Sequence, residues 1–166
     1  CVIERVPKER LAKMGDNPQG VALEVSRYPY VDLSDIILLA QERQEDLFIL
    51  MLDMIQNPQN LGTLLRSADA VGVHGIIIPQ HRAAEVTPAV VNASSGASEH
   101  MLIAQANLVQ VIDEIKKLNV WVVGLDGGPG SQRVQDIRLD GPIAVIVGNE
   151  GEGMRALVRE KCDFLL

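Results

Sequence analysis

Residues 55–72 read IQNPQNLGTLLRSADAVG, and this stretch decides the fold. It follows an apolar run, Leu47–Leu52, which predicts a buried strand. The apolar residues of the stretch itself recur at helical spacing and predict a helix over Leu61–Val71. We expect Asn60 to cap this helix and Gly72 to end it in the left-handed conformation. A strand that leads directly into a helix is the repeating unit of an α/β sheet.

Arg66 is the first candidate functional residue. The polar side of the predicted helix carries Gly62, Arg66 and Asp69. In an open α/β sheet the functional residues lie beyond the carboxyl ends of the strands, and Arg66 is expected there. The alternative is that Arg66 forms an ion pair with Asp69, one turn further along the helix. This stretch alone leaves both interpretations open.

The remainder of the chain alternates between apolar runs and helical patterns. The runs predict strands at Gly75–Ile78, Met101–Ala104, Val120–Gly124, Ile143–Val147 and Phe164–Leu166, with an earlier one at Gln19–Ser26. The helical patterns lie at Leu33–Gln44, Thr87–Ala93, Leu108–Leu118 and Met154–Lys161. Continuously apolar strands with helical crossovers indicate an α/β fold, a parallel sheet with helices on both faces.

Composition limits the function classes. The 166 residues carry a net charge of −7 and 3% aromatic residues, which argues against a broad nucleic-acid surface or a base-stacking platform. No apolar run reaches the roughly 18 residues of a membrane span, and there is no signal-peptide pattern. Two cysteines and three isolated histidines make no metal-ligand spacing. We expect a soluble, cytoplasmic protein without a metal, its histidines at the surface or in caps and Trp121 in the core.

Three loops follow predicted strand ends on one rim of the sheet, namely Asp53–Asn60, Gly124–Gly130 and Gly148–Gly153. Glycine lets backbone approach a ligand closely, so the rim suggests a small molecule held by main chain, with ordinary tight turns as the alternative. Neither glycine loop matches a phosphate-binding motif. Glu150 and Glu152 would repel a phosphate, so a ligand with positive charge, such as S-adenosylmethionine, suits the last loop better.

Two motifs resemble those of a known family. The pattern Asn57-Pro58-x-Asn60-x-Gly62-x3-Arg66-x-Ala68-x2-Val71-Gly72 resembles the first signature of the SpoU (TrmH-like) RNA ribose 2′-O-methyltransferases, which belong to the SPOUT superfamily. The pattern Gly148-x-Glu150-Gly151-x-Gly153 resembles their second signature. Ser95–Glu99 and Val122–Gly124 also fall where this family has them. The resemblance runs from about Leu47 to Leu166.

The resemblance implies a SPOUT-type trefoil knot, a homodimer and S-adenosylmethionine as methyl donor. It implies that Gly124, Leu125, Gly148, Asn149 and Gly151 bind the cofactor. The acceptor would be an RNA ribose 2′-hydroxyl, with guanosine in large-subunit ribosomal RNA favoured and transfer RNA as the alternative. The family's third signature, a Pro-containing strand end and a Ser-Leu-Asn run, is absent up to Leu166, so a catalytically silent RNA-binding or dimerisation module is a further alternative.

Three residues are the catalytic candidates that this family pattern implies. Arg66 would clamp a phosphate and stabilise the developing alkoxide, because a guanidinium keeps its proton. Asn60 would cap its helix, orient Arg66, or do both. Glu150 would organise its loop by accepting backbone N–H bonds rather than take a proton, and Asp126 and Glu152 would be solvated carboxylates.

The resemblance also divides the chain into two parts. Residues 1–18 read as a tether or the end of a preceding RNA-binding domain, because they are polar and carry Pro7, Gly15 and Pro18. Residues 19–166 read as the catalytic domain without its third signature. We expect no membrane partner.

Overall fold

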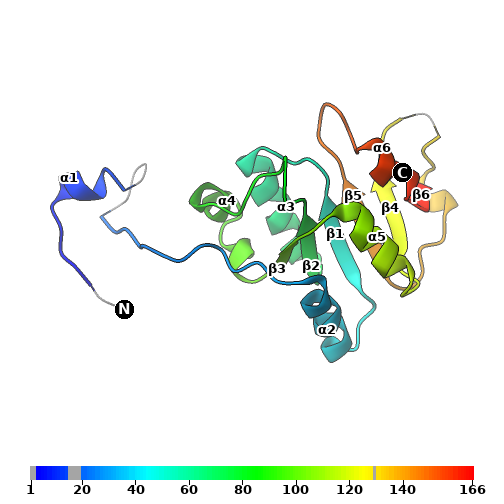
Figure 1. Ribbon diagram of the computed structural model, residues 1–166, viewed down its shortest axis with the longest axis horizontal. Helices are drawn as coiled ribbons and strands as arrows, with labels where there is room; N and C mark the ends of the chain where they lie inside the picture. Colours follow the sequence, from blue (N-terminus) through cyan, green and yellow to red (C-terminus); the bar gives the residue numbers. More distant parts are fainter. Residues whose placement is uncertain (1–2, 15–19, 129) are drawn as a thin grey trace.

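The computed structural model describes residues 3–14, 20–128 and 130–166. Its body is a six-stranded sheet in the order β3-β2-β1-β5-β4-β6, and every described pair is parallel (Figure 1). The strands are β1 (Phe48–Leu52), β2 (Gly75–Ile78), β3 (Leu102–Gln105), β4 (Trp121–Leu125), β5 (Ile143–Val147) and β6 (Phe164–Leu165). The predicted α/β class is therefore confirmed, and these six strands begin and end within one residue of the expected positions.

The strand order places β5 in the middle of the sheet. From β1 the chain steps outward through β2 to β3, returns to form β4, and then inserts β5 between β1 and β4. Phe48 pairs with Ile143 and Leu52 with Val147, so β1 and β5 end side by side. Because ligands bind beyond the carboxyl ends of parallel strands, this point of reversal is where a site is expected.

Helices cover both faces of the sheet. On one face lie α2 (Leu33–Arg43), α5 (Leu108–Lys116) and α6 (Ala156–Glu160), whose apolar side chains pack on Ile49, Met51 and Ile146. On the other face α3 (Pro58–Ala70) and α4 (Pro88–Ala93) pack on Leu50, Leu52 and Ile76. The remaining helical turns are α1 (Lys8–Leu11), η1 (Ala97–Glu99) and η2 (Val134–Asp136). In the described part of the chain, no helix has the length and apolarity to cross a membrane.

The helix α3 begins earlier than predicted. Asn57, not Asn60, is its cap, since the Asn57 side chain accepts hydrogen bonds from the backbone of Gln59 and Asn60. Pro58 occupies the first helical position, which proline favours because its φ is fixed and it has no N–H to satisfy. Gly62 is buried against α4 rather than on the polar side. Gly72 has a φ of 76°, as expected for the residue that ends the helix.

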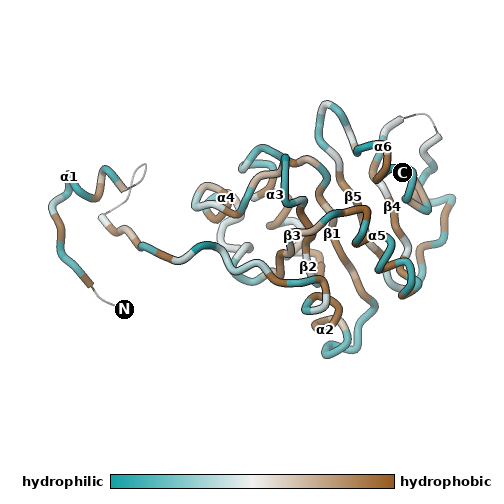
Figure 2. Tube along the Cα trace, viewed as in Figure 1, coloured by the Kyte–Doolittle hydropathy of each residue, from teal (hydrophilic) through white to brown (hydrophobic). Residues whose placement is uncertain are grey.

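The predicted strand at Gln19–Ser26 is wrong for the residues described. Residues 20–26 form no strand, and Val21, Leu23 and Val25 are exposed. Figure 2 shows this segment as part of an extended arm with mixed hydropathy. The arm meets the body at Tyr28 and Tyr30, whose rings contact each other edge to face. An alternating apolar pattern makes a strand only where a partner strand exists, and none lies beside residues 20–26.

Two side chains lie elsewhere than expected. Trp121 is 40% exposed, because β4 lies near the edge of the sheet, and its ring contacts Phe164. His74 is buried rather than at the surface. Its Nδ1 accepts a hydrogen bond of 3.0 Å from the Phe48 N–H, and its Nε2 lies 2.9 Å from the Glu45 carboxylate. His74 thus joins the start of β1 to the turn before β2.

Candidate functional site

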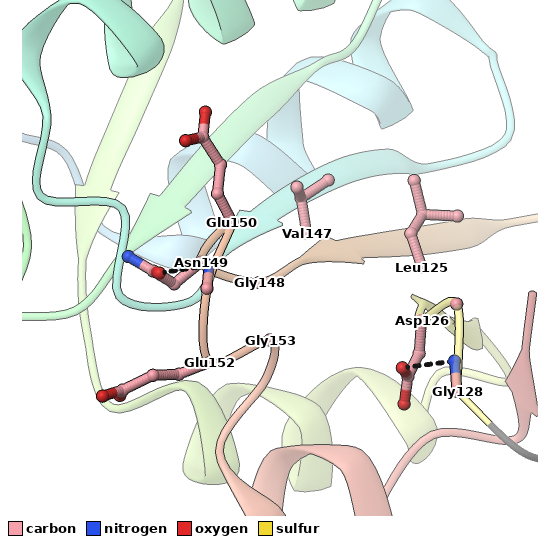
Figure 3. A pocket seen from close by; sticks show the side chains of 11 residues that line it. Leu125, Asp126, Gly128, Val147, Gly148, Asn149, Glu150, Glu152 and Gly153 are labelled. Atoms are coloured by element: carbon pink, nitrogen blue, oxygen red, sulfur yellow. Dashed lines mark hydrogen bonds between the residues drawn. The ribbon is translucent and has the colours of Figure 1, made fainter.

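A cleft of about 360 Å³ opens at the carboxyl ends of β4 and β5 (Figure 3). One wall is the segment Leu125–Gly128 after β4, and the other is Val147–Gly153 after β5. These two strands are hydrogen-bonded neighbours, so their ends meet at one edge of the sheet. Leu125 and Val147, which share a register position, give the cleft its apolar part. Its volume falls in the range of small-molecule sites.

The loop Gly148–Gly153 is folded back on itself. The backbones of Asn149 and Gly153 exchange two hydrogen bonds, of 3.0 and 2.9 Å, and Gly153 has a φ of 70°. The Asn149 side chain accepts a further bond of 2.9 Å from the Gly151 N–H. A Cβ on Gly148 would lie 2.3 Å from the Gly153 carbonyl carbon. Glycine at position 148 is therefore required by the close approach of the two ends of the loop.

Asp126 organises the opposite wall. Its carboxylate accepts a bond of 3.0 Å from the Gly128 N–H and forms an ion pair with Arg159 of α6. The Arg159 guanidinium, followed by the Gly128 N–H, holds the pKa of Asp126 below its usual value. The expectation of a merely solvated carboxylate at Asp126 is therefore wrong. The Asp126 N–H also donates a 2.7 Å bond to the Leu166 carbonyl, which ties this wall to the residue after β6.

The two motifs meet through side chains. The Asn60 side-chain amide donates a hydrogen bond of 2.7 Å to the Glu150 carboxylate. The Asn149 amide donates one of 3.1 Å to the Met54 carbonyl in the loop before α3. Glu150 therefore connects its loop to α3, while Asn149 provides the local bonds within the loop. The bond from a backbone N–H within the loop that was predicted for Glu150 is accepted by the Asn149 side chain.

Arg66 is exposed on α3, about a turn and a half beyond Asn60. Among the described residues Arg66 forms no ion pair with Asp69, so the alternative interpretation, in which Arg66 only pairs with Asp69, is wrong. Its five N–H donors are thus available to an incoming group. The exposed fork lies on the helix that Asn60 connects to the wall of the cleft.

The five predicted cofactor residues divide between the cleft and its support. Leu125, Gly148, Asn149 and Gly151 line the cleft. Gly124 lies one residue behind it, where a Cβ would approach Met154 Cε to 2.6 Å and Cys162 Sγ to 2.9 Å. Gly124 therefore acts through the packing of β4 against the segment around α6. Burial raises the pKa of the Cys162 thiol to about 11.

Sequence reasoning missed one interaction beside the cleft. Asp53 follows β1 directly, and its side chain is completely buried. Its two carboxylate oxygens accept bonds from the Arg155 backbone N–H at 2.8 Å and from Arg155 Nε at 2.7 Å. The available signal was an acidic residue at the end of a fully apolar strand, where burial requires a partner.

The charge of the cleft favours a cationic ligand. Its lining residues include Asp126, Glu150 and Glu152, and no lysine or arginine among the described residues. Asp126 is paired with Arg159 and Glu150 is bonded to Asn60, so the net acidic charge at the rim is only partly neutralised. Glycine backbone supplies most of the remaining surface. In the described part of the chain no cluster of His, Cys, Asp and Glu could hold a metal ion. A ligand with a positive centre and polar groups for main-chain hydrogen bonds fits this lining, whereas a phosphate does not.

Comparison with known proteins gives matches over most of the chain. Residues 47–166 match the model of the SpoU rRNA Methylase family. YacO of Bacillus subtilis, a protein assigned to the TrmH family of tRNA/rRNA methyltransferases, is 44% identical over 99% of this chain. The chain covers 66% of YacO, so it spans about two thirds of the length of that relative.

Solved structures share the fold. The SpoU methyltransferase AviRb of Streptomyces viridochromogenes, in complex with the cofactor AdoMet, superposes with a TM-score of 0.71. It is 29% identical, over 82% of this chain and 54% of that one. An RNA 2′-O ribose methyltransferase superposes with a TM-score of 0.62 at 30% identity, over 73% of this chain and 46% of that one. The chain thus spans about half the length of these structures.

Proposed function

The chain belongs to the SpoU rRNA methylase family, and from that premise we propose that it transfers a methyl group from S-adenosylmethionine to a ribose 2′-hydroxyl of RNA. We propose guanosine in large-subunit ribosomal RNA as the target, with transfer RNA as the alternative. The 2′-hydroxyl assignment is supported by the similarity to a solved RNA 2′-O ribose methyltransferase.

The contact between Asn60 and Glu150 carries this proposal. It joins the helix that bears Arg66 to the loop that lines the cleft, although the two residues stand 90 positions apart. The start of the helix that bears Arg66 is thereby fixed against the loop that lines the cleft. Positioning of this kind supplies much of the rate in a displacement reaction, because the reacting atoms must lie in line.

The cleft is the proposed site for S-adenosylmethionine. When bound, the cofactor would supply the methyl group of its sulfonium to the ribose oxygen, leaving as the thioether, and the hydroxyl proton would pass to solvent water. Gly148, Asn149 and Gly151 would line the bound cofactor, while Leu125 offers an apolar surface. The N–H groups of Asn149 and Gly151 are already bonded within the loop, so the carbonyl oxygens of these residues would contact the ligand. Gly124 would contribute from behind the wall, through packing. The carboxylates at the rim suit the positive charge of the ligand.

Arg66 is proposed to bind the RNA. Its guanidinium can clamp a phosphate through two parallel N–H donors and can stabilise the negative charge that develops on the ribose oxygen. It keeps its own proton, since the pKa of a guanidinium lies above about 12. Asn60 and Glu150 are proposed to fix the position of α3 relative to the loop Gly148–Gly153. Neither residue is assigned the proton transfer.

The remaining family properties are proposals for this chain. We propose a homodimer with its site near the subunit interface, a trefoil knot in the carboxyl-terminal part and a location in the cytoplasm. We also propose that residues 19–166 are the catalytic domain and residues 1–18 a tether. Gln19 and the residues from Gly15 to Pro18 lie outside the described part of the structure.

Two measurements test the function. Isothermal titration of the intact protein with S-adenosylmethionine should show saturable binding. Ribosomal and transfer RNA, each incubated with the protein and labelled cofactor, should then be digested and searched for 2′-O-methylated nucleosides. Binding without transfer to either RNA would support the silent module instead. Absence of binding would reject the methyltransferase function itself.

A further inference from the structure

We propose that Asp53 and Arg155 are positioning residues for the cofactor loop, a role that rests on the proposed function. Neither residue lines the cleft. Both instead hold the two ends of the loop Gly148–Gly153 to the end of β1. The proposal assigns a binding role to residues that lie outside both sequence motifs.

Asp53 contacts the chain on both sides of this loop. Before the loop, the Asp53 N–H donates a 2.8 Å bond to the Val147 carbonyl and extends the β1–β5 ladder by one residue. After the loop, its carboxylate accepts the two bonds from Arg155. One residue at the carboxyl end of β1 therefore fixes the distance between the entry and the exit of the loop.

The loop Gly148–Gly153 contacts the segment Asp53–Asn60 along its length as well as at its ends. Asn149 donates to the Met54 carbonyl, and Glu150 accepts from Asn60. Met54 itself has a φ of 60°, a conformation that non-glycine residues rarely adopt. The segment from Asp53 to Asn60 thus forms the outer support of the loop, whose other side faces the cleft.

The burial of Asp53 indicates the role of its ion pair with Arg155. The Asp53 side chain is 0% exposed, whereas that of Arg155 is 42% exposed. A buried ion pair adds little net stability compared with an apolar pair, but losing one partner leaves a buried charge unsatisfied. Such a pair suits a place where one loop conformation must be selected. The loop must hold a ligand through backbone groups, so its conformation determines affinity.

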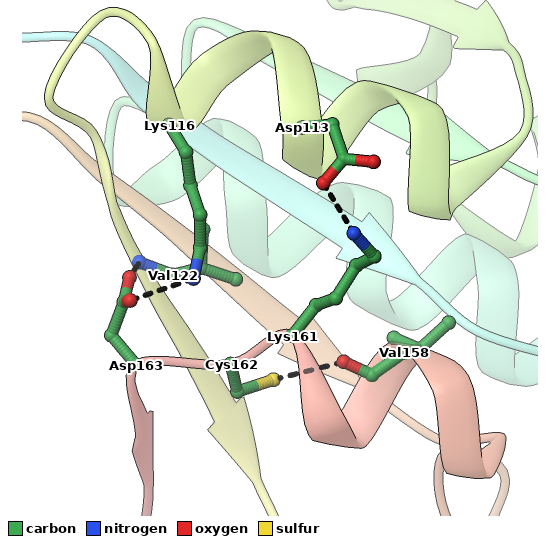
Figure 4. A network of polar contacts seen from close by, with 7 residues as sticks. All are labelled: Asp113, Lys116, Val122, Val158, Lys161, Cys162 and Asp163. Atoms are coloured by element: carbon green, nitrogen blue, oxygen red, sulfur yellow. Dashed lines mark hydrogen bonds and ion pairs between the residues drawn. The ribbon is translucent and has the colours of Figure 1, made fainter.

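The chain offers a matched control in Asp163 (Figure 4). Its carboxylate also accepts one backbone bond, from the Val122 N–H at 2.9 Å, and one from a cation, Lys116 Nζ at 2.7 Å. Asp163 lies before β6, and its partner Val122 lies near the start of β4, at the end of the strand away from the cleft. Asp163→Asn therefore removes a pair of similar geometry without touching the loop, at a side chain that is 27% exposed where that of Asp53 is fully buried.

The test compares Asp53→Asn with Asp163→Asn in the intact protein. Asparagine replaces one of the two acceptor oxygens that face Arg155 by an NH2 group, which only donates. We expect Asp53→Asn to raise the Kd for S-adenosylmethionine by about 10- to 100-fold, a loss like that seen when groups that orient metal ligands are removed. Amide hydrogen exchange at 148–153 should become faster without ligand. Asp163→Asn should leave both quantities unchanged, even where its melting temperature falls.

A second pair of variants keeps the test valid if Asp53→Asn does not fold. Arg155→Ala should weaken cofactor binding, and Arg155→Lys, which keeps the charge, should recover part of the loss. The KM for the cofactor should rise in these variants while the KM for RNA stays constant. Equal Kd values for wild type, Asp53→Asn and Arg155→Ala would overturn the inference and leave the proposed function intact. Absence of binding by the wild type would instead reject the proposed function and, with it, this inference.

Discussion

The side-chain amide of Asn60 donates a 2.7 Å hydrogen bond to the carboxylate of Glu150, which stands 90 positions later in the chain. This contact brings the first motif against the second at the rim of the cleft. Asn60 does not cap α3, because the helix starts at Pro58 and Asn60 lies within its first turn. The Asn60 side chain therefore reaches the neighbouring loop instead.

Asn60 and Glu150 are expected to act as a unit. Asn60→Ala and Glu150→Ala should each lower kcat/KM, and the double variant should lose less than the sum of the two, with a coupling of about 1 kcal/mol for one hydrogen bond to a charged group near solvent. A double-mutant cycle on single-turnover methyl transfer measures this coupling. Strictly additive losses would show that the contact has no part in the reaction.

Arg66 can be separated from the cofactor site. Arg66→Ala should reduce methyl transfer by about 100-fold or more, the loss typical of removing a group that stabilises transition-state charge. The Kd for S-adenosylmethionine should stay within a few-fold, because Arg66 does not line the cleft. Since Arg66 is exposed, the melting temperature should not change. Loss of cofactor binding together with activity would give Arg66 a structural role instead.

Gly148 should not tolerate a side chain. Gly148→Ala would place its Cβ 2.3 Å from the Gly153 carbonyl carbon and 2.5 Å from the Met154 nitrogen, so the loop must shift. We expect a loss of about 1–3 kcal/mol in the free energy of unfolding and a marked rise in cofactor Kd. Gly127→Ala is the control for the free energy of unfolding alone, because a Cβ there meets no atom within 4 Å but Gly127 itself lines the cleft. Urea denaturation and calorimetry distinguish the two variants.

Tyr28 should give the protein a stability transition at high pH. Burial, followed by the charge of Glu99, raises the pKa of Tyr28 from 10.0 to about 12. Between these values the unfolded chain loses the phenol proton while the folded chain keeps it, so stability is complete below pH 10 and falls as the pH rises toward 12. Melting temperatures between pH 8 and pH 11.5 measure the effect. Tyr28→Phe should reduce this slope but not abolish it, because burial also raises the pKa of Tyr30.

Tyr28→Phe should also have a second effect at neutral pH. It removes the 2.7 Å bond from the phenol to the Ser98 carbonyl, which holds the extended arm on η1. The expected loss is about 1 kcal/mol. An unchanged slope in the variant would mean that another group titrates in this range.

The sheet was predictable because its strands are continuously apolar. Runs such as Ile143–Val147 can be buried only with both faces covered, which predicts a parallel sheet with helical crossovers. The left-handed residue Gly72 also followed from its type. Strand order did not follow, since no local pattern says that β5 inserts between β1 and β4. The first strand failed for a related reason: Val21, Leu23 and Val25 alternate correctly but have no neighbour to pair with.

The sequence motifs of the site were predictable, but the side-chain contacts between them were not. The two motifs located Asn60, Arg66 and Glu150, but the hydrogen bond between Asn60 and Glu150 depends on tertiary structure. Helix α3 begins three residues before the expected start because an Asn-Pro pair caps it, a signal that outweighs the onset of the apolar stripe. The position of Asp53 at the end of an apolar strand indicated burial, but nothing in the sequence indicated that its partner would be Arg155, 102 residues later.

The position of β5 has a consequence for the order in which the protein folds. During synthesis β1, β2 and β3 emerge first and can pair with one another, while one edge of β1 stays open until Ile143–Val147 has left the ribosome. Pairing across about 95 residues is slow, since a long loop must close before any contact forms. The binding cleft therefore forms at the end of folding. Until then the nascent half-sheet presents an unpaired row of backbone N–H and C=O groups along β1, which chaperones or a partner strand would cover.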